Sequence, residues 1–106
     1  MNRQAYEEFF KLFDDMENTR MHFLTETDRG HLVQEVRKEI EAAKELGSQG
    51  ERRIALEDLL ENLIEIGLYL TPEQIKLADR AFGKKSMGEQ TTLNYYREHL
   101  IWSKLP

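Results

Sequence analysis

The sequence contains no cysteine and no long apolar run among its 106 residues. The missing cysteines exclude disulfide bonds, thiolate nucleophiles and zinc sites with cysteine ligands, and their absence suits a reducing compartment. No apolar stretch approaches the length of a membrane span, and the first residues lack the basic start and apolar run of a secretory signal. We therefore expect a cytoplasmic protein that makes no contact with a membrane.

Signatures of the common enzyme classes are missing as well. The chain has no Gly-x-Ser-x-Gly nucleophile elbow, no glycine-rich phosphate loop and no dinucleotide-binding fingerprint. Its histidines, His22, His31 and His99, lie far apart, and none stands in a His-x-x-x-His or Glu-x-x-His spacing. A carboxylate-metal enzyme in a helical bundle would need acids that point inward from several helices. We therefore expect no enzymatic activity, no metal and no cofactor.

Positive charge is scarce, because 20 acidic residues outnumber 15 basic ones and give a net charge of −5. A protein that binds nucleic acid directly would show the opposite sign, whereas a partner protein with a positive surface would be attracted. Moderate negative charge is equally what keeps an ordinary protein soluble. The acidic excess lies in residues 1–70, and residues 71–106 carry a net charge of +2.

Apolar residues recur at helical spacing along most of the chain. They predict helices over about residues 3–18, 27–46, 51–66, 72–82 and 89–102. A chain of 106 residues fits one domain with one core, and no alternating run is long enough to pair as a strand. The prediction is an all-α fold, a single domain over residues 1–106 formed by about five helices in irregular or orthogonal packing.

Local signals place several of the helix ends. Thr27 or Asp28 is suited to cap the second helix. Thr71 is suited to cap the fourth, where Pro72 follows and Gln74 completes a capping box. Glycines are expected to end three of the helices: Gly47, Gly67 and Gly83.

Aromatic residues gather toward the two ends of the chain. The first helix has a stripe that predicts a large contribution to the core, formed by Tyr6, Phe9, Phe10, Phe13 and Met16. In the last third of the chain, Tyr96 and Trp102 are expected to pack in the core. Tyr95 is expected to be exposed, and an exposed tyrosine is typical of a protein interface.

The third predicted helix carries an acidic stripe. Glu57, Glu61 and Glu65 are four residues apart, and Asp58 lies beside them. They fall opposite the apolar positions, and no lysine or arginine on that stretch offsets their mutual repulsion. Such a stripe is typical of a helix face that only contacts solvent. It is also typical of a surface that binds positive charge, carried either by a basic protein or by a metal ion. These four acids and Tyr95 are the predicted partner-binding residues.

Two further acidic groups are weaker candidates. The first is interleaved with basic residues, as on a solvated face: Glu35, Glu39, Glu41 and Glu45, with Arg37, Lys38 and Lys44. The second is placed to edge a binding surface: Asp14, Asp15 and Glu17.

The stretch ALEDLLENLIE at residues 55–65 leads through a short loop into Thr71, Pro72 and Gln74, and on to Ala78 and Phe82. This order resembles the small helical bacterial immunity proteins of polymorphic toxin systems, in the MafI-like and contact-dependent growth inhibition groups. In those proteins a helix with the pattern A-L-E-x-L-x-x-N-L precedes a short loop and a capped helix. The likeness covers about residues 42–83.

The resemblance implies a protein that binds the toxin domain of a large secreted effector in the cytoplasm and blocks it. Many such toxins are basic nucleases, including EndoU-like RNases, and an acidic helical surface would complement their charge. The resemblance transfers no contact residues. The alternative is a self-associating helical adaptor or regulatory module without a toxin partner. Its homodimer surface would use the apolar stripe of the second helix and the exposed aromatics of the last.

Overall fold

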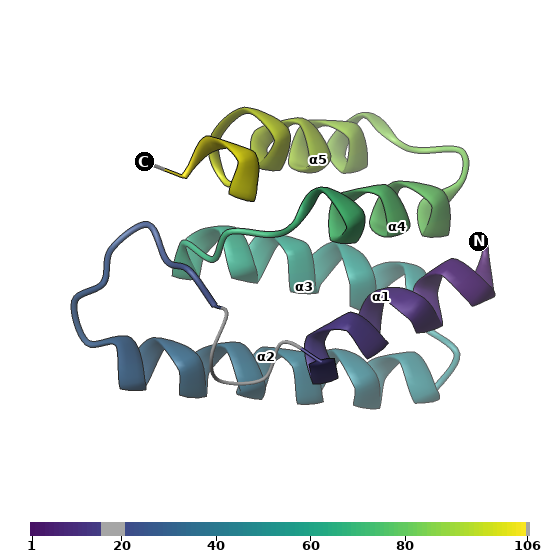
Figure 1. Cartoon of the computed structure of the whole chain (residues 1–106). Helices are drawn as coiled ribbons and strands as arrows, with labels where there is room; N and C mark the ends of the chain where they lie inside the picture. Colours follow the sequence, from purple (N-terminus) through teal and green to yellow (C-terminus); the bar gives the residue numbers. More distant parts are fainter. Residues whose placement is uncertain (16–20, 106) are drawn as a thin grey trace.

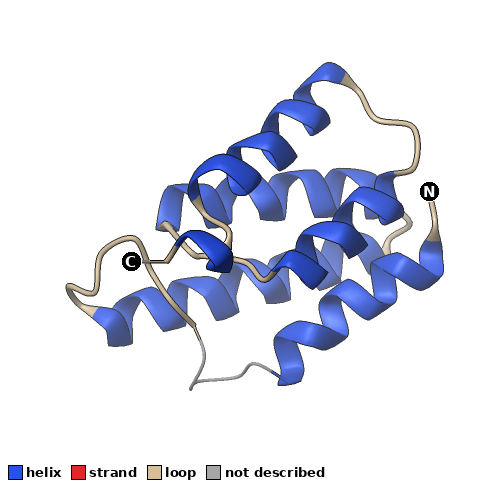
Figure 2. Cartoon of the chain, turned by 45° about the horizontal axis from the view of Figure 1, so that its top comes forward, coloured by secondary structure: helices blue, strands red, loops and turns tan. Residues whose placement is uncertain are grey.

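The computed structural model describes residues 1–15 and 21–105, and most of these are helical (Figure 1). The elements are α1 (Arg3–Asp15), α2 (Arg29–Ser48), α3 (Arg52–Ile66), α4 (Pro72–Phe82), α5 (Met87–His99) and the short 3-10 helix η1 (Trp102–Lys104). Figure 2 shows helices and loops alone, and no strand forms among the described residues. The predicted all-α fold is therefore confirmed. Met16 and the predicted end of the first helix at residue 18 lie outside the described residues.

The helices pack mainly in two pairs. α2 packs against α3, α1 packs against α4, and α5 lies against both α3 and α4. Within each pair the helices run in opposite directions, whereas α3 and α5 run the same way (Figure 1). All five α-helices contribute side chains to the core. The buried side chains of α2 are smaller than those of the other helices. The largest fully buried apolar residues of the core include Phe9, Leu56, Leu59, Leu60, Leu63, Phe82, Leu93 and Tyr96.

The helix α4 forms as its local sequence predicts. The amide of Gln74 donates to the Thr71 hydroxyl at 3.1 Å, and the amide of Thr71 donates to the Gln74 side chain at 2.9 Å. This is the expected capping box, which satisfies two amides that have no partner inside the helix. Gly67 ends α3 with φ 84°, a left-handed conformation that glycine adopts without a steric penalty. Gly83 follows the last residue of α4.

The last helix begins earlier and ends earlier than predicted. Ser86 and Glu89 form a second capping box, so α5 starts at Met87 and not at Glu89. It ends at His99 instead of Trp102, because the chain then turns to bond with the loop before α4. The amide of Trp102 donates to the Leu70 carbonyl, and its indole donates to the Tyr69 carbonyl. Trp102 is therefore half-buried over that loop.

The predicted ends of the second helix are also corrected. Helix α2 starts at Arg29, and Asp28 adopts a left-handed conformation with φ 58° and makes no capping hydrogen bond through its side chain. The helix continues through Gly47 to Ser48, so Gly47 is not its stop. A Cβ at Gly47 would overlap the Tyr6 hydroxyl. Gly47 is therefore a packing position, at which the missing side chain lets the Tyr6 ring approach α2.

A buried loop joins α3 to α4 and is held from both sides. Leu68, Tyr69 and Leu70 are all buried. Phe23 forms an antiparallel bridge with Leu68, and Ile101 forms a parallel bridge with Leu70. Residues 22–24 and residues 100–102 thereby supply backbone partners to the loop, with N···O distances between 2.7 and 3.0 Å. Buried peptide groups need such partners, because leaving one unpaired costs about 1–3 kcal/mol.

The contact between Gly47 and Tyr6 gives a first prediction. Gly47→Ala should lower the free energy of unfolding by about 1–2 kcal/mol, because the new methyl group meets the Tyr6 hydroxyl. Helix propensity alone would give a gain of about 1 kcal/mol. In a Tyr6→Phe background the same substitution should be neutral or stabilising. Urea unfolding of the four proteins tests this, and an equal loss in both backgrounds would contradict it.

Candidate protein-binding surface

The outer face of α3 carries the acidic stripe. Asp58, Glu61 and Glu65 are exposed, and they lie on the side of the helix opposite its buried leucines. Ile54, one turn before Asp58, is 50% exposed and extends the same stripe. Within the described part of the chain no ion pair reaches Asp58, Glu61 or Glu65. This face therefore presents negative charge that the protein itself does not neutralise.

Glu57 differs from the other three acids, because it is half-buried and not fully exposed as predicted. It lies on the side of α3 that faces α5, with one carboxylate oxygen 4.0 Å from the position a Cβ would take at Gly88. The pKa of Glu57 is raised, first by burial and then by the negative charges of Glu89, Glu61 and Asp58. Arg53 offsets part of this effect. Burial is thus the main cause of the raised pKa of Glu57, and repulsion from neighbouring carboxylates adds to it.

Arg53 is a cation of α3 whose charge acts on Glu57, but its hydrogen bonds hold it against α5 and the loop before it. Its guanidinium donates to both carboxylate oxygens of Glu89, at 2.8 and 2.6 Å. It also donates to the carbonyls of Phe82 and Lys84, at 3.0 and 2.6 Å. Burial would raise the pKa of Glu89, which is only 2% exposed, but the bonds from Arg53 and Ser86 hold it below its ordinary value. Four hydrogen bonds thus fix Arg53 at the start of α5.

A second internal cluster of ion pairs contains two basic residues from the last third of the chain. Asp79 of α4 pairs with Lys85 at 2.5 Å and with Arg97 at 2.7 Å. Burial tends to raise the pKa of Asp79, but hydrogen bonds and charges from these two cations lower it overall. Part of the positive charge of residues 71–106 therefore lies in ion pairs that connect α4 with α5 and with the loop before α5. It does not offset the acids on the outer face of α3.

A groove with a volume of about 120 Å³ lies between α2 and α3, and it reaches the acidic stripe at Asp58. Glu39 and Asp58 line it from opposite helices, and the Asn62 amide donates to Glu39 at 2.8 Å. The remaining lining is apolar: Ala42, Ala43, Leu46, Ala55 and Leu59. The sequence pattern placed Glu39 in a charge-compensated cluster on α2 and did not predict its position beside Asp58. No local signal could reveal it, because the register of α2 against α3 is set by packing.

Tyr95 lies on α5, on the side of α5 that borders α3. Gly88 is beside Glu57, and Tyr95 follows two helical turns later on the same side of α5. The neighbouring Tyr96 is buried and donates its hydroxyl to the Leu60 carbonyl of α3 at 2.8 Å. Tyr95 is 40% exposed, and its ring contacts that of His99 at 4.7 Å. The exposure predicted for Tyr95 and the burial predicted for Tyr96 are both confirmed.

Other predicted features contribute less to a binding surface. The apolar stripe of α2 is largely buried against the rest of the chain: Val33, Val36, Ile40 and Ala43. It is thus occupied within the folded chain. Asp14 pairs with Lys44 at 3.4 Å, and Glu35 lies 4.0 Å from His31. Among the described residues, no group of three or more acids and histidines is arranged to hold a metal ion. None of the described helices has both the length and the apolar character to cross a membrane.

Comparison of the chain with known protein families finds no match. Comparisons with curated proteins and with solved structures find no significant match either. The surface formed by α3, the groove beside it and Tyr95 is therefore interpreted from its own chemistry.

The raised pKa of Glu57 gives a second prediction. Glu57→Gln should increase the free energy of unfolding at pH 7 by about 0.3–0.5 kcal/mol, because it removes a carboxylate whose charge is disfavoured first by burial and then by its acidic neighbours. A carboxyl group with a raised folded-state pKa opposes folding once the pH exceeds that pKa. The gain should therefore be full at neutral pH and vanish below the ordinary pKa of 4.5. Urea unfolding between pH 4 and pH 8 measures it.

The matched control for Glu57→Gln is Glu26→Gln, at an exposed position in the loop before α2. The control should leave the free energy of unfolding unchanged across the same pH range. A loss of stability in Glu57→Gln at pH 7 would show that a favourable contact of this carboxylate outweighs the repulsion.

Proposed function

We propose that this protein is an immunity protein that binds and neutralises a basic toxin domain, such as a nuclease, and that it has no catalytic activity of its own. The observation that carries this proposal is the acidic face of α3, whose carboxylates are without ion pairs among the described residues. A basic partner would supply the missing positive charge. The likeness of residues 42–83 to helical immunity proteins, given above, supports the same class of partner.

The groove beside α3 suits the side chains by which a basic protein would bind. Lysine and arginine have long apolar stems and charged heads. A stem would lie along the apolar lining of the groove, and its head would reach Glu39 or Asp58 at the rim. Nuclease active sites are rich in such residues because they bind phosphates. An acidic protein that covers them would block access of the nucleic acid without contacting it.

Exposed apolar residues beside the stripe would supply the short-range part of the interface. Ile54 continues the stripe on α3 and Tyr95 lies on the neighbouring helix α5, and they are 50% and 40% exposed. Aromatic and aliphatic anchors at the centre of an interface slow dissociation, whereas complementary charge mainly speeds association. The combination would give a rapid and long-lived inhibitory complex.

The function is tested by capture and co-expression. The tagged chain should retain a basic protein domain in equimolar amount from lysates of the source cells, identified by mass spectrometry. Expression of that domain alone should stop growth, and co-expression of this chain should restore it. If the captured domain is harmless, or if it stays toxic when this chain is co-expressed, the immunity proposal is wrong.

The binding surface is tested by charge reversal with a matched control. Glu61→Lys/Glu65→Lys should weaken binding to the captured domain at least about tenfold, mainly through a slower association rate. The control is Glu8→Lys/Glu26→Lys, which changes net charge equally at exposed positions outside α3. Surface plasmon resonance at low and high salt should show that added salt slows association of the parent more than of the α3 variant. Equal binding by both double variants would place the interface elsewhere.

A further inference from the structure

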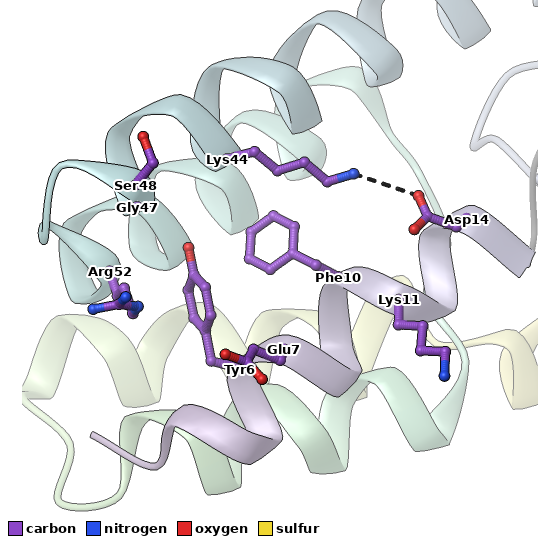
Figure 3. A pocket seen from close by; sticks show the side chains of 9 residues that line it. All are labelled: Tyr6, Glu7, Phe10, Lys11, Asp14, Lys44, Gly47, Ser48 and Arg52. Carbon is purple, nitrogen blue, oxygen red and sulfur yellow. Dashed lines mark hydrogen bonds and ion pairs between the residues drawn. The ribbon is translucent and has the colours of Figure 1, made fainter.

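Two of the hollows beside α2 differ in the charge of their lining. The larger one, of about 320 Å³, lies between α1, α2 and the start of α3. Figure 3 shows Tyr6 and Phe10 of α1 directed toward α2, and both rings belong to the buried core. The charged lining of this hollow consists of three cations and two acids: Lys11, Lys44, Arg52, Glu7 and Asp14. A basic side chain of a partner would meet net positive charge there.

The smaller hollow is the groove between α2 and α3, of about 120 Å³. Small-molecule pockets usually measure about 300–1,000 Å³, so this groove has room for one side chain and not for a larger ligand. Both of its charged residues are acids, Glu39 on α2 and Asp58 on α3. Lys38, which precedes Glu39, is exposed and is not part of the lining. The groove therefore suits a single positively charged side chain.

The two carboxylates of the groove have acceptor atoms to spare. Glu39 accepts a hydrogen bond from the Asn62 amide at 2.8 Å through Oε2, and its Oε1 makes no hydrogen bond with the described residues. Asp58 forms neither a hydrogen bond nor an ion pair with the described part of the chain. Because the two acids line the groove from opposite helices, a cation between them can be bound from both sides.

The chemistry of the groove favours arginine over lysine. Its apolar lining consists of small and aliphatic side chains: Ala42, Ala43, Leu46, Ala55 and Leu59. The methylene stem of either basic residue can lie on such a surface, but the charged heads differ. An ammonium is a compact and strongly hydrated charge, whereas a guanidinium is a planar fork with five donors and weaker hydration. The guanidinium therefore loses less hydration in the groove and can donate to a carboxylate on each wall.

We propose that this groove is the anchor site for one arginine of the partner, with its stem on the apolar lining and its guanidinium between Glu39 and Asp58. The inference rests on the proposed function, because it names the side chain by which the basic partner is held. The exposed acids Glu61 and Glu65 attract the partner from a distance, and the groove then retains one side chain. An anchor of this kind acts mainly on the dissociation rate.

The first test uses N-acetyl-arginine methylamide and N-acetyl-lysine methylamide as probes, each with one positive charge. In nuclear magnetic resonance of the full chain, the arginine probe should give saturable shifts of the backbone amides of Ala42, Ala43 and Asp58. It should bind about fivefold more tightly than the lysine probe, because it makes additional charged hydrogen bonds. An absence of saturable shifts, or binding of the lysine probe that is equal or tighter, would overturn the proposal. This test requires no toxin.

Three variants connect the binding to the groove. Ala42→Leu places a larger side chain at an exposed position of the lining and keeps both carboxylates, so it should abolish the saturable shifts. Asp58→Asn should weaken binding of the arginine probe about fivefold or more. The matched control is Gln34→Leu, which adds an apolar side chain at an exposed position of α2 outside the groove and should bind like the parent. Unchanged binding in Ala42→Leu would contradict the proposal.

The second test measures the complex with the captured domain by surface plasmon resonance. Ala42→Leu should raise the dissociation rate at least about tenfold, and Gln34→Leu should leave it unchanged. If Ala42→Leu has no effect while Glu61→Lys/Glu65→Lys still slows association, the arginine anchor is wrong and the immunity proposal stands. If Ala42→Leu speeds the release of a domain that proves harmless to cells, the immunity proposal is wrong and the arginine anchor stands.

Discussion

The buried loop between α3 and α4 is the constraint on which the arrangement of the helices depends. Leu68, Tyr69 and Leu70 enter the core, so their peptide groups need partners inside the protein. The segment after α1 and the segment after α5 provide them on opposite sides. Both segments are thereby drawn to the end of α3, and α5 must run in the same direction as α3 to reach it (Figure 1).

The charges of the protein are divided between internal pairs and an unpaired surface. Arg53, Lys85 and Arg97 bind Glu89 or Asp79, and these pairs join α5 to its two neighbours. Buried or half-buried pairs of this kind add geometric definition more than net stability. Because these cations are engaged there, the carboxylates on the outer face of α3 are left without them. The unpaired negative charge on the outer face of α3 is thus a consequence of how the helices are joined.

Sequence reasoning succeeded where the controlling interactions are local. The capping box of Thr71 and Gln74, the left-handed turn at Gly67 and the burial of Tyr96 all follow from residues within about two turns. The predictions that were wrong concern positions at which a residue far away in the sequence determines the local structure. Gly47 looked like a helix stop, but it is required by Tyr6, 41 positions earlier in the numbering. The last helix was predicted to reach Trp102, but it ends at His99 because the Trp102 amide donates a hydrogen bond to the Leu70 carbonyl.

The sequence by itself determined the five helices, the apolar face of each and the acidic outer face of α3, because helical periodicity depends only on the spacing of neighbouring residues. Only the tertiary structure decided which charges are paired. It also brought Glu39 across the groove from Asp58, turned Glu57 toward α5 and set the Tyr6 hydroxyl against Gly47. These relations depend on how far one helix is shifted along another. That shift is set by side-chain packing between distant parts of the chain, which no local pattern encodes.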